Sequence, residues 1–147
     1  MSSRGSRARA AGGKREVLGL ADTSIFIARE GSRPIGSLPE RLAVSVVTIG
    51  ELQLGVLAAT DRVTRARRAR TLAVARRSDP IPISEAVMTT WAHLVQSCRE
   101  AGESKSVKAP DALIAATAIE HGLAVVTQDK DFDLIAAAVP ALDVIKV

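Results

Sequence analysis

The sequence LGLADTSIF, at residues 18–26, runs from a short apolar segment directly into the carboxylate of Asp22. An apolar run of this length predicts a buried β-strand, here over residues 17–21, that ends at the acid. A second run of the same kind, LAVVT at residues 123–127, also ends just before acidic residues. Between the two, apolar runs alternate with helical patterns, which is typical of an α/β domain with a mainly parallel sheet.

The other elements are expected where apolar runs or helical periodicity continue along the chain. Thr48 and Glu51 fit the Ser/Thr-x-x-Glu box that starts helices, which places Glu51 in a first helical turn. Pro110 suits the first turn of another helix, and Gly122 suits its C-terminal end. The remaining predictions are strands over residues 42–47 and 142–147 and helices over residues 48–59, 62–77, 84–100, 110–121 and 131–139.

Composition limits the organisation of the chain. With 147 residues, of which 47% are hydrophobic, it has apolar side chains for one core. We therefore expect one domain over residues 16–147, after a basic, disordered arm over residues 1–15. The single cysteine, Cys98, excludes an intramolecular disulfide and favours a reducing, cytoplasmic compartment. No apolar run reaches the roughly 18 residues that span a bilayer, and the net charge of +4 favours a polyanionic partner.

Four carboxylates lie in segments that are otherwise apolar or rich in small residues: Asp22, Glu51, Asp111 and Asp129, with Asp131 close to the last. Burying one carboxylate without a partner costs on the order of several kcal/mol, so four such placements need a common cause. A hard divalent cation held by these oxygens is such a cause. Helix N-termini also favour carboxylates, which is the alternative for Glu51 and Asp111 but does not explain Asp22.

The acids therefore predict a metal-dependent site for phosphodiester hydrolysis. Mg²⁺ usually keeps several waters and takes one or two direct carboxylates. We expect Asp22 and Asp111 to bind Mg²⁺ or Mn²⁺ directly, and Glu51 and Asp129 to act through water or on a second ion. A zinc site is excluded because Cys and His are too few. A phosphotransfer site of the haloacid-dehalogenase type would need a second Asp at position 24, which is Ser24.

Four fragments in order resemble one known family. They are LADTS at residues 20–24, SVVTIGEL at 45–52, PDALIAATA at 110–118 and VVTQDKDF at 125–132. Together they resemble PIN-domain nucleases and, among these, the VapC-type toxins of bacterial type II toxin–antitoxin pairs. The resemblance implies a three-layer α/β/α sandwich with an acidic site at the rim of its sheet. It also implies an Mg²⁺-dependent endoribonuclease that cleaves RNA and so inhibits translation and growth.

Roles are carried over to this chain position by position. The resemblance implies that Asp22, Glu51 and Asp111 are the first three acids of the family's set. The fourth is Asp129 or Asp131. We favour Asp129 because it lies closer to the strand end, with Asp131 as a supporting residue or a cap of the helix that follows.

Hydroxyl side chains next to these acids are expected to support them. Thr23 and Thr127 are placed to orient metal-bound water or carboxylates by hydrogen bonds. Ser24 is placed for the same role, although ordinary turn and cap contacts explain it equally well.

Arginines outside the acidic rim are expected to bind the substrate. The segment 62–77 carries seven of them, and Arg65 and Arg68 are the predicted RNA contacts. A solvated helix surface and an antitoxin-binding surface are the alternatives for this segment. Stacking of RNA bases is not expected to dominate, because aromatic residues make up only 2% of the chain.

The family resemblance also implies partners. A cognate antitoxin is expected to lay its C-terminal segment across the toxin and block the acidic site. Leu52, Leu54, Val56 and Leu57 are candidates to line the groove, although core packing is the alternative for several. A homodimer and a larger toxin–antitoxin hetero-oligomer are expected as well. The competing functions are a PIN nuclease that is not a toxin, and a PIN-like scaffold that binds RNA or a partner without cutting.

Overall fold

The computed structural model describes residues 18–147, so the predicted arm over residues 1–15 lies outside the described residues. Within this range the chain forms one sheet of four parallel strands in the order β2-β1-β3-β4. The strands are β1 (Leu18–Ala21), β2 (Arg41–Val44), β3 (Ala124–Thr127) and β4 (Val144–Lys146). The two central strands, β1 and β3, are those that the sequence predicts to end at acids.

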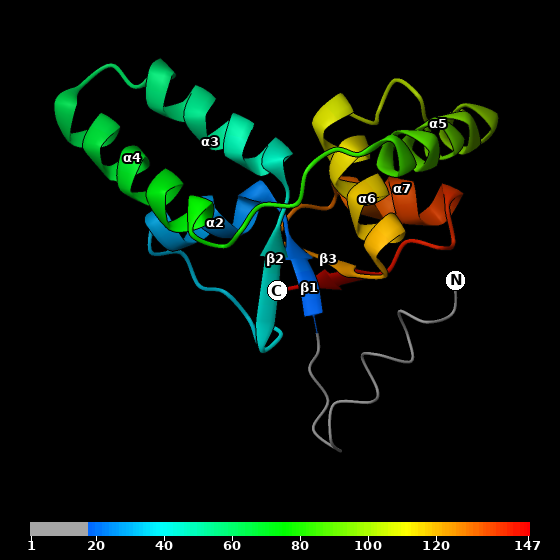
Figure 1. Ribbon diagram of the computed structural model, residues 1–147, viewed down its shortest axis with the longest axis horizontal. Helices are drawn as coiled ribbons and strands as arrows, with labels where there is room; N and C mark the ends of the chain where they lie inside the picture. The colour runs from blue at the N-terminus through cyan, green and yellow to red at the C-terminus, as the bar shows by residue number, and fades with distance from the viewer. Residues whose placement is uncertain (1–17) are drawn as a thin grey trace.

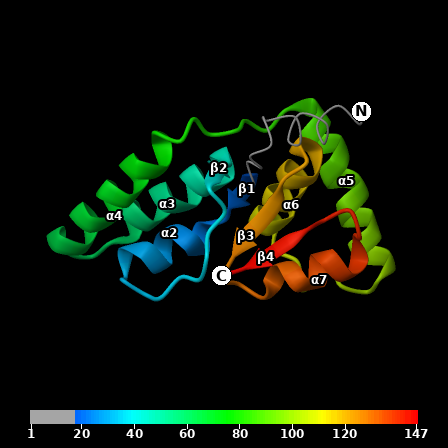
Figure 2. The same cartoon turned by 90° about the horizontal axis from the view of Figure 1, so that it is seen from below.

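Helices cover both faces of the sheet (Figure 1). They are α2 (Thr23–Glu30), α3 (Val46–Ala58), α4 (Arg62–Arg76), α5 (Glu85–Glu100), α6 (Ala109–His121) and α7 (Asp131–Ala138). The group α2, α3 and α4 lies on one side, and the group α5, α6 and α7 lies on the other (Figure 2). This is the predicted α/β/α sandwich. No helix within residues 18–147 has the length and apolar character needed to cross a membrane.

The central strands divide their side chains between the two layers of helices. Leu20 and Val125 pack in the core under α5, α6 and α7. The next residue of each strand, Ala21 and Val126, packs in the core on the side of α2, α3 and α4. Strands that are buried on both faces read as continuous apolar runs, and this is why the two runs predicted strands. A Cβ added to Gly19 would lie 2.4 Å from Cγ2 of Val126, so β1 packs closely on its neighbour here.

Most predicted elements are confirmed within a few residues, and Gly122 ends α6 with a left-handed conformation, as expected (φ 67°). The start of α3 was predicted wrongly. Strand β2 ends at Val44, and the helix begins at Val46, because the hydroxyl of Ser45 accepts a hydrogen bond from the Val47 N–H at 3.0 Å. Ser45 is therefore the N-cap, and Glu51 lies in the second turn of α3 and not in the first.

Candidate active site

Asp22 lies at the carboxyl end of β1, where it is the N-cap of α2 and only 4% exposed. Its backbone N–H donates to the Val126 carbonyl of β3 at 3.0 Å. Two hydroxyls donate to its carboxylate: Ser24 Oγ to Oδ1 at 2.6 Å and Thr127 Oγ1 to Oδ2 at 3.0 Å. The pKa of Asp22 is raised to about 6, chiefly by burial; the two hydrogen bonds act to lower it, and the charge of Asp129 contributes to raising it.

The same two hydroxyls connect Asp22, which follows β1, to the turn that follows β3. Ser24 Oγ accepts the backbone N–H of Gln128 at 3.0 Å, and Thr127 Oγ1 accepts that of Asp129 at 2.8 Å. Each hydroxyl thus donates to Asp22 and accepts from the turn that follows β3. The turn and the buried carboxylate are held together as one unit. The sequence alone does not favour this role for Ser24 over ordinary turn contacts, and the one signal it offers is a position two residues after the acid.

Glu51 projects toward the start of α2 from the second turn of α3. Thr23 Oγ1 donates to Glu51 Oε1 at 2.5 Å and lies 3.3 Å from Thr48 Oγ1. The first residue of α2 therefore positions the carboxylate of α3. Predicting Glu51 in a first turn was wrong, but its predicted position at the rim is supported by this contact.

Asp111 lies in the first turn of α6, as predicted. Burial raises its pKa to about 7, and so do the negative charges of Glu51, Asp131, Asp129 and Asp22, in that order. All four other predicted acids therefore act on this one carboxyl group. The fold brings together side chains from the end of β1, from α3, from α6 and from the segment between β3 and α7.

Asp129 and Asp131 have different local contacts. Asp129 Oδ1 accepts the backbone N–H of Asp131, the first residue of α7, at 3.3 Å. Asp131 is itself the first residue of that helix, and the alternative that it caps the helix is wrong. Its Oδ2 instead lies 3.6 Å from Lys108 Nζ. Which of the two acids is the fourth catalytic residue stays a prediction, with Asp129 favoured.

Known proteins resemble this chain in sequence. Residues 20–138 match the PIN domain family. The chain belongs to the PIN-domain family. Among curated proteins, this PIN domain is 64% identical to Ribonuclease VapC8 of Mycobacterium tuberculosis over 101 residues, which are 69% of this chain and 90% of that protein. It is 46% identical to Ribonuclease VapC4 of the same species over 133 residues, 87% and 95% of the two chains.

A solved structure has the same fold. The VapBC-5 toxin–antitoxin structure from Mycobacterium tuberculosis superposes with a TM-score of 0.79 at 35% sequence identity. The match covers 89% of this chain and 99% of that chain. Both the sequence and the architecture thus place the PIN domain beside VapC proteins.

The residues at the rim of the PIN domain fit a divalent cation. Every predicted ligand is a carboxylate, and oxygen is the donor that Mg²⁺ and Mn²⁺ prefer. The pKa values of Asp22 and Asp111 are raised first by burial and also by neighbouring negative charge, and a bound cation would compensate both effects. Among residues 18–147, no group of three or more His, Cys, Asp or Glu side chains is arranged so that it could hold a metal ion as it stands. Mg²⁺ usually takes only one or two direct carboxylates and completes its shell with water.

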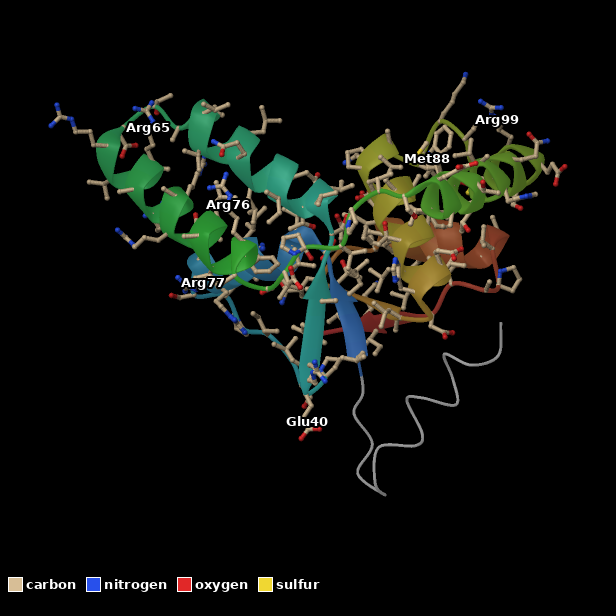
Figure 3. All side chains as sticks on the ribbon, viewed as in Figure 1. Glu40, Arg65, Arg76, Arg77, Met88 and Arg99 are labelled. Carbon is tan, nitrogen blue, oxygen red and sulfur yellow. The ribbon has the colours of Figure 1, made fainter. Side chains whose placement is uncertain are left out.

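The two arginines predicted to contact RNA have structural contacts in the PIN domain. Arg65 Nη2 donates to the Ala59 carbonyl at 2.7 Å, and Arg68 Nη1 donates to the Gly55 carbonyl at 2.7 Å. Both bonds attach α4 to the C-terminal part of α3. Figure 3 shows Arg65 at the outer end of the α3–α4 hairpin. Binding of RNA by these two residues stays a prediction.

Proposed function

We propose that this PIN domain is the toxin of a type II toxin–antitoxin pair and acts as a divalent-metal-dependent endoribonuclease in the cytoplasm. The observation that carries this proposal is the convergence of Asp22, Glu51, Asp111 and Asp129 at one rim. The names of its relatives support RNA as the substrate, because two proteins at 64% and 46% identity are called ribonucleases.

Each carboxylate has a role that its contacts support. Asp22 and Asp111 would hold Mg²⁺ or Mn²⁺, since they are the acids whose buried charge most needs compensation. When bound, such an ion supplies charge stabilisation at the phosphate and lowers the pKa of water. Glu51 has one carboxylate oxygen bonded to Thr23, which leaves the other oxygen to orient a water and accept its proton. Asp129 stands beside Asp22 and supports a second ion or an ordered water.

Cleavage of total RNA by the purified protein tests this proposal. We expect cleavage that stops on chelation and returns with Mg²⁺ or Mn²⁺. Asp22→Ala and Asp111→Ala should abolish it. Asp133→Ala is the matched control, because Asp133 is an exposed acid of α7 that pairs with Lys146 outside the cluster. Cleavage that survives in either of the first two variants contradicts the metal-site assignment.

The surface beside the acids supports the antitoxin part of the proposal. A cavity of about 230 Å³ opens between α2, α3 and α4, and its lining includes Thr23, Glu51, Leu52 and Ile27. It therefore runs from the acidic site onto apolar side chains, as a segment that blocks the site requires. Among the leucines predicted to line a groove, Leu52 borders this cavity, whereas Leu54 and Leu57 are 66% and 71% exposed. Val56 packs instead against the core.

An antitoxin with an apolar segment would dock on this surface. Ile27→Glu, at an exposed residue that lines this cavity, should weaken co-purification with the product of a small neighbouring reading frame but leave RNA cleavage intact. If the substitution abolishes both RNA cleavage and the complex, the claim that this surface binds only the antitoxin is contradicted. A homodimer and a larger hetero-oligomer with antitoxin are part of the proposal, and sedimentation of the toxin with and without its partner measures both.

A further inference from the structure

Lys108 is the residue immediately before α6, and its backbone is fixed relative to Asp111. Its conformation is extended (φ −78°, ψ 146°), and its carbonyl accepts the N–H of Ala112 at 3.0 Å. One helical turn therefore separates it from the acid whose pKa responds to the whole cluster. The ammonium group lies 3.6 Å from Asp131 Oδ2, so the side chain reaches back over the acidic rim.

The ion pair between Lys108 and Asp131 is loose. Charge-assisted N–H···O bonds are typically about 2.7–2.9 Å long, and this pair is longer. The lysine side chain is 73% exposed and that of Asp131 is 31% exposed. Exposed pairs of this kind contribute roughly 0–1 kcal/mol to stability. The ion pair therefore contributes little to the stability of the fold. Lys108 loses little free energy when it leaves Asp131 for another partner.

RNA meets an electrostatic problem at this site. Each of its linkages carries a negative charge, and the rim that must receive one of them is built from carboxylates. A cation at the catalytic centre compensates charge at the linkage that is cut, but not at its neighbours. A positive side chain beside the rim solves this problem, and lysine is well suited because it binds phosphate as a compact charge on a flexible stem.

We propose that Lys108 leaves Asp131 to bind an RNA phosphate next to the linkage that is cut, and so holds the strand against Asp111. This inference rests on the proposed ribonuclease function. Two other lysines, Lys105 and Lys146, lack the contact with Asp131. Lys105 is exposed on the same loop and has no ion pair or hydrogen bond to another described side chain, and Lys146 pairs with Asp133 at 2.8 Å.

Steady-state cleavage of a defined RNA by Lys108→Gln, Lys108→Arg and Lys105→Gln tests the proposal. Lys105→Gln makes the same charge change on the same loop and is the matched control. We expect Lys108→Gln to raise KM about tenfold, the scale of one lost charged hydrogen bond, and to change kcat less than about twofold. The slope of log KM against log salt should fall by about one, and Lys108→Arg should keep most of the affinity.

RNA binding measured by fluorescence anisotropy with a chelator present gives a second readout that does not depend on catalysis. Lys108→Gln should weaken binding there as well, with urea unfolding equal to that of Lys105→Gln. The proposal is overturned if the two variants share one KM and one RNA affinity, or if Lys108→Gln lowers kcat with KM unchanged. If the wild type cleaves RNA and Lys108→Gln behaves as Lys105→Gln does, only the inference about Lys108 is refuted. A wild-type protein that neither binds nor cuts RNA refutes the proposed function with it.

Discussion

Replacing Asp22 with Asn should stabilise the metal-free protein, and the gain should depend on pH. Asp22 is buried, and its pKa is raised from 3.8 to about 6. The folded protein therefore binds a proton at this carboxyl more tightly than the unfolded chain does. The stability that comes from the protonated group is present in full below pH 3.8 and is lost as the pH rises through 6. At pH 8 the wild type carries the whole cost of a buried charge, which Asn does not have.

The two pKa values set the magnitude. A tenfold change in an ionisation constant corresponds to about 1.4 kcal/mol, so the difference between 3.8 and about 6 corresponds to about 3 kcal/mol. The net gain should be smaller, about 1–2 kcal/mol. In Asn the amide NH₂ replaces the oxygen that accepts the Thr127 hydroxyl, so this hydroxyl must reorient from donor to acceptor. At pH 4 the folded acid is almost fully protonated and the unfolded acid partly so, so most of the cost of the buried charge is absent and Asn should be no more stable than Asp.

Urea unfolding with a chelator present, at pH 8 and at pH 4, measures both values. The wild type should also gain stability on addition of Mg²⁺ at pH 8, because a ligand that binds only the folded state stabilises it, whereas Asp22→Asn should gain less. Asp133→Asn controls for the removal of an acid from the surface and should change stability by less than about 1 kcal/mol at either pH. If Asp22→Asn is no more stable than the wild type at pH 8 without metal, the claim that Asp22 is a costly buried charge is refuted.

Ser24→Ala removes the hydroxyl that donates to the buried carboxylate and accepts a backbone N–H. It should lower the free energy of unfolding in urea at pH 8 by about 1–3 kcal/mol, and a loss below about 0.5 kcal/mol would count against that contact. Gly19→Ala should destabilise by about 1–3 kcal/mol, because its Cβ meets Val126 at 2.4 Å. Gly50→Ala, in α3, should instead stabilise by about 0.5–1 kcal/mol, because the new Cβ would meet nothing within 4 Å beyond its own helical turn. If both glycine variants change stability in the same direction, this account of the packing is contradicted. Arg68→Ala should lower the thermal midpoint through the lost bond to α3, at a cost of about 1–2 kcal/mol, and an unchanged midpoint would show that this bond does not hold the hairpin.

The strands that end at the site could be predicted because their environment leaves a plain mark on the sequence. β1 and β3 are buried on both faces, so neither strand alternates with polar residues, and the acid that follows each marks the rim. Helix α2 could not be predicted in the same way. It has eight residues, and the β-branched and aromatic side chains of Ile25 and Phe26 suit a strand as well as a helix. Its helical form follows from packing on α3 and α4.

The members of the acidic site could be predicted more easily than their contacts. Carboxylates in apolar segments stand out in a sequence, whereas the partner of a hydroxyl depends on which strands lie side by side. Ser24 fits an ordinary turn until β3 is placed next to β1, when it becomes a link between Asp22 and Gln128. The capping box at Glu51 fails for a similar reason, because the buried Ser45 takes the capping role.

The sheet order has a consequence for when this protein becomes active. Strand β1 is made early and β3 late, yet the two are neighbours, and the hydroxyl of Thr127 that bonds to Asp22 comes from a residue 105 positions further along the chain. A chain still emerging from the ribosome carries Asp22 without the strand that completes its surroundings. The acidic site therefore cannot assemble until synthesis of the chain is nearly finished.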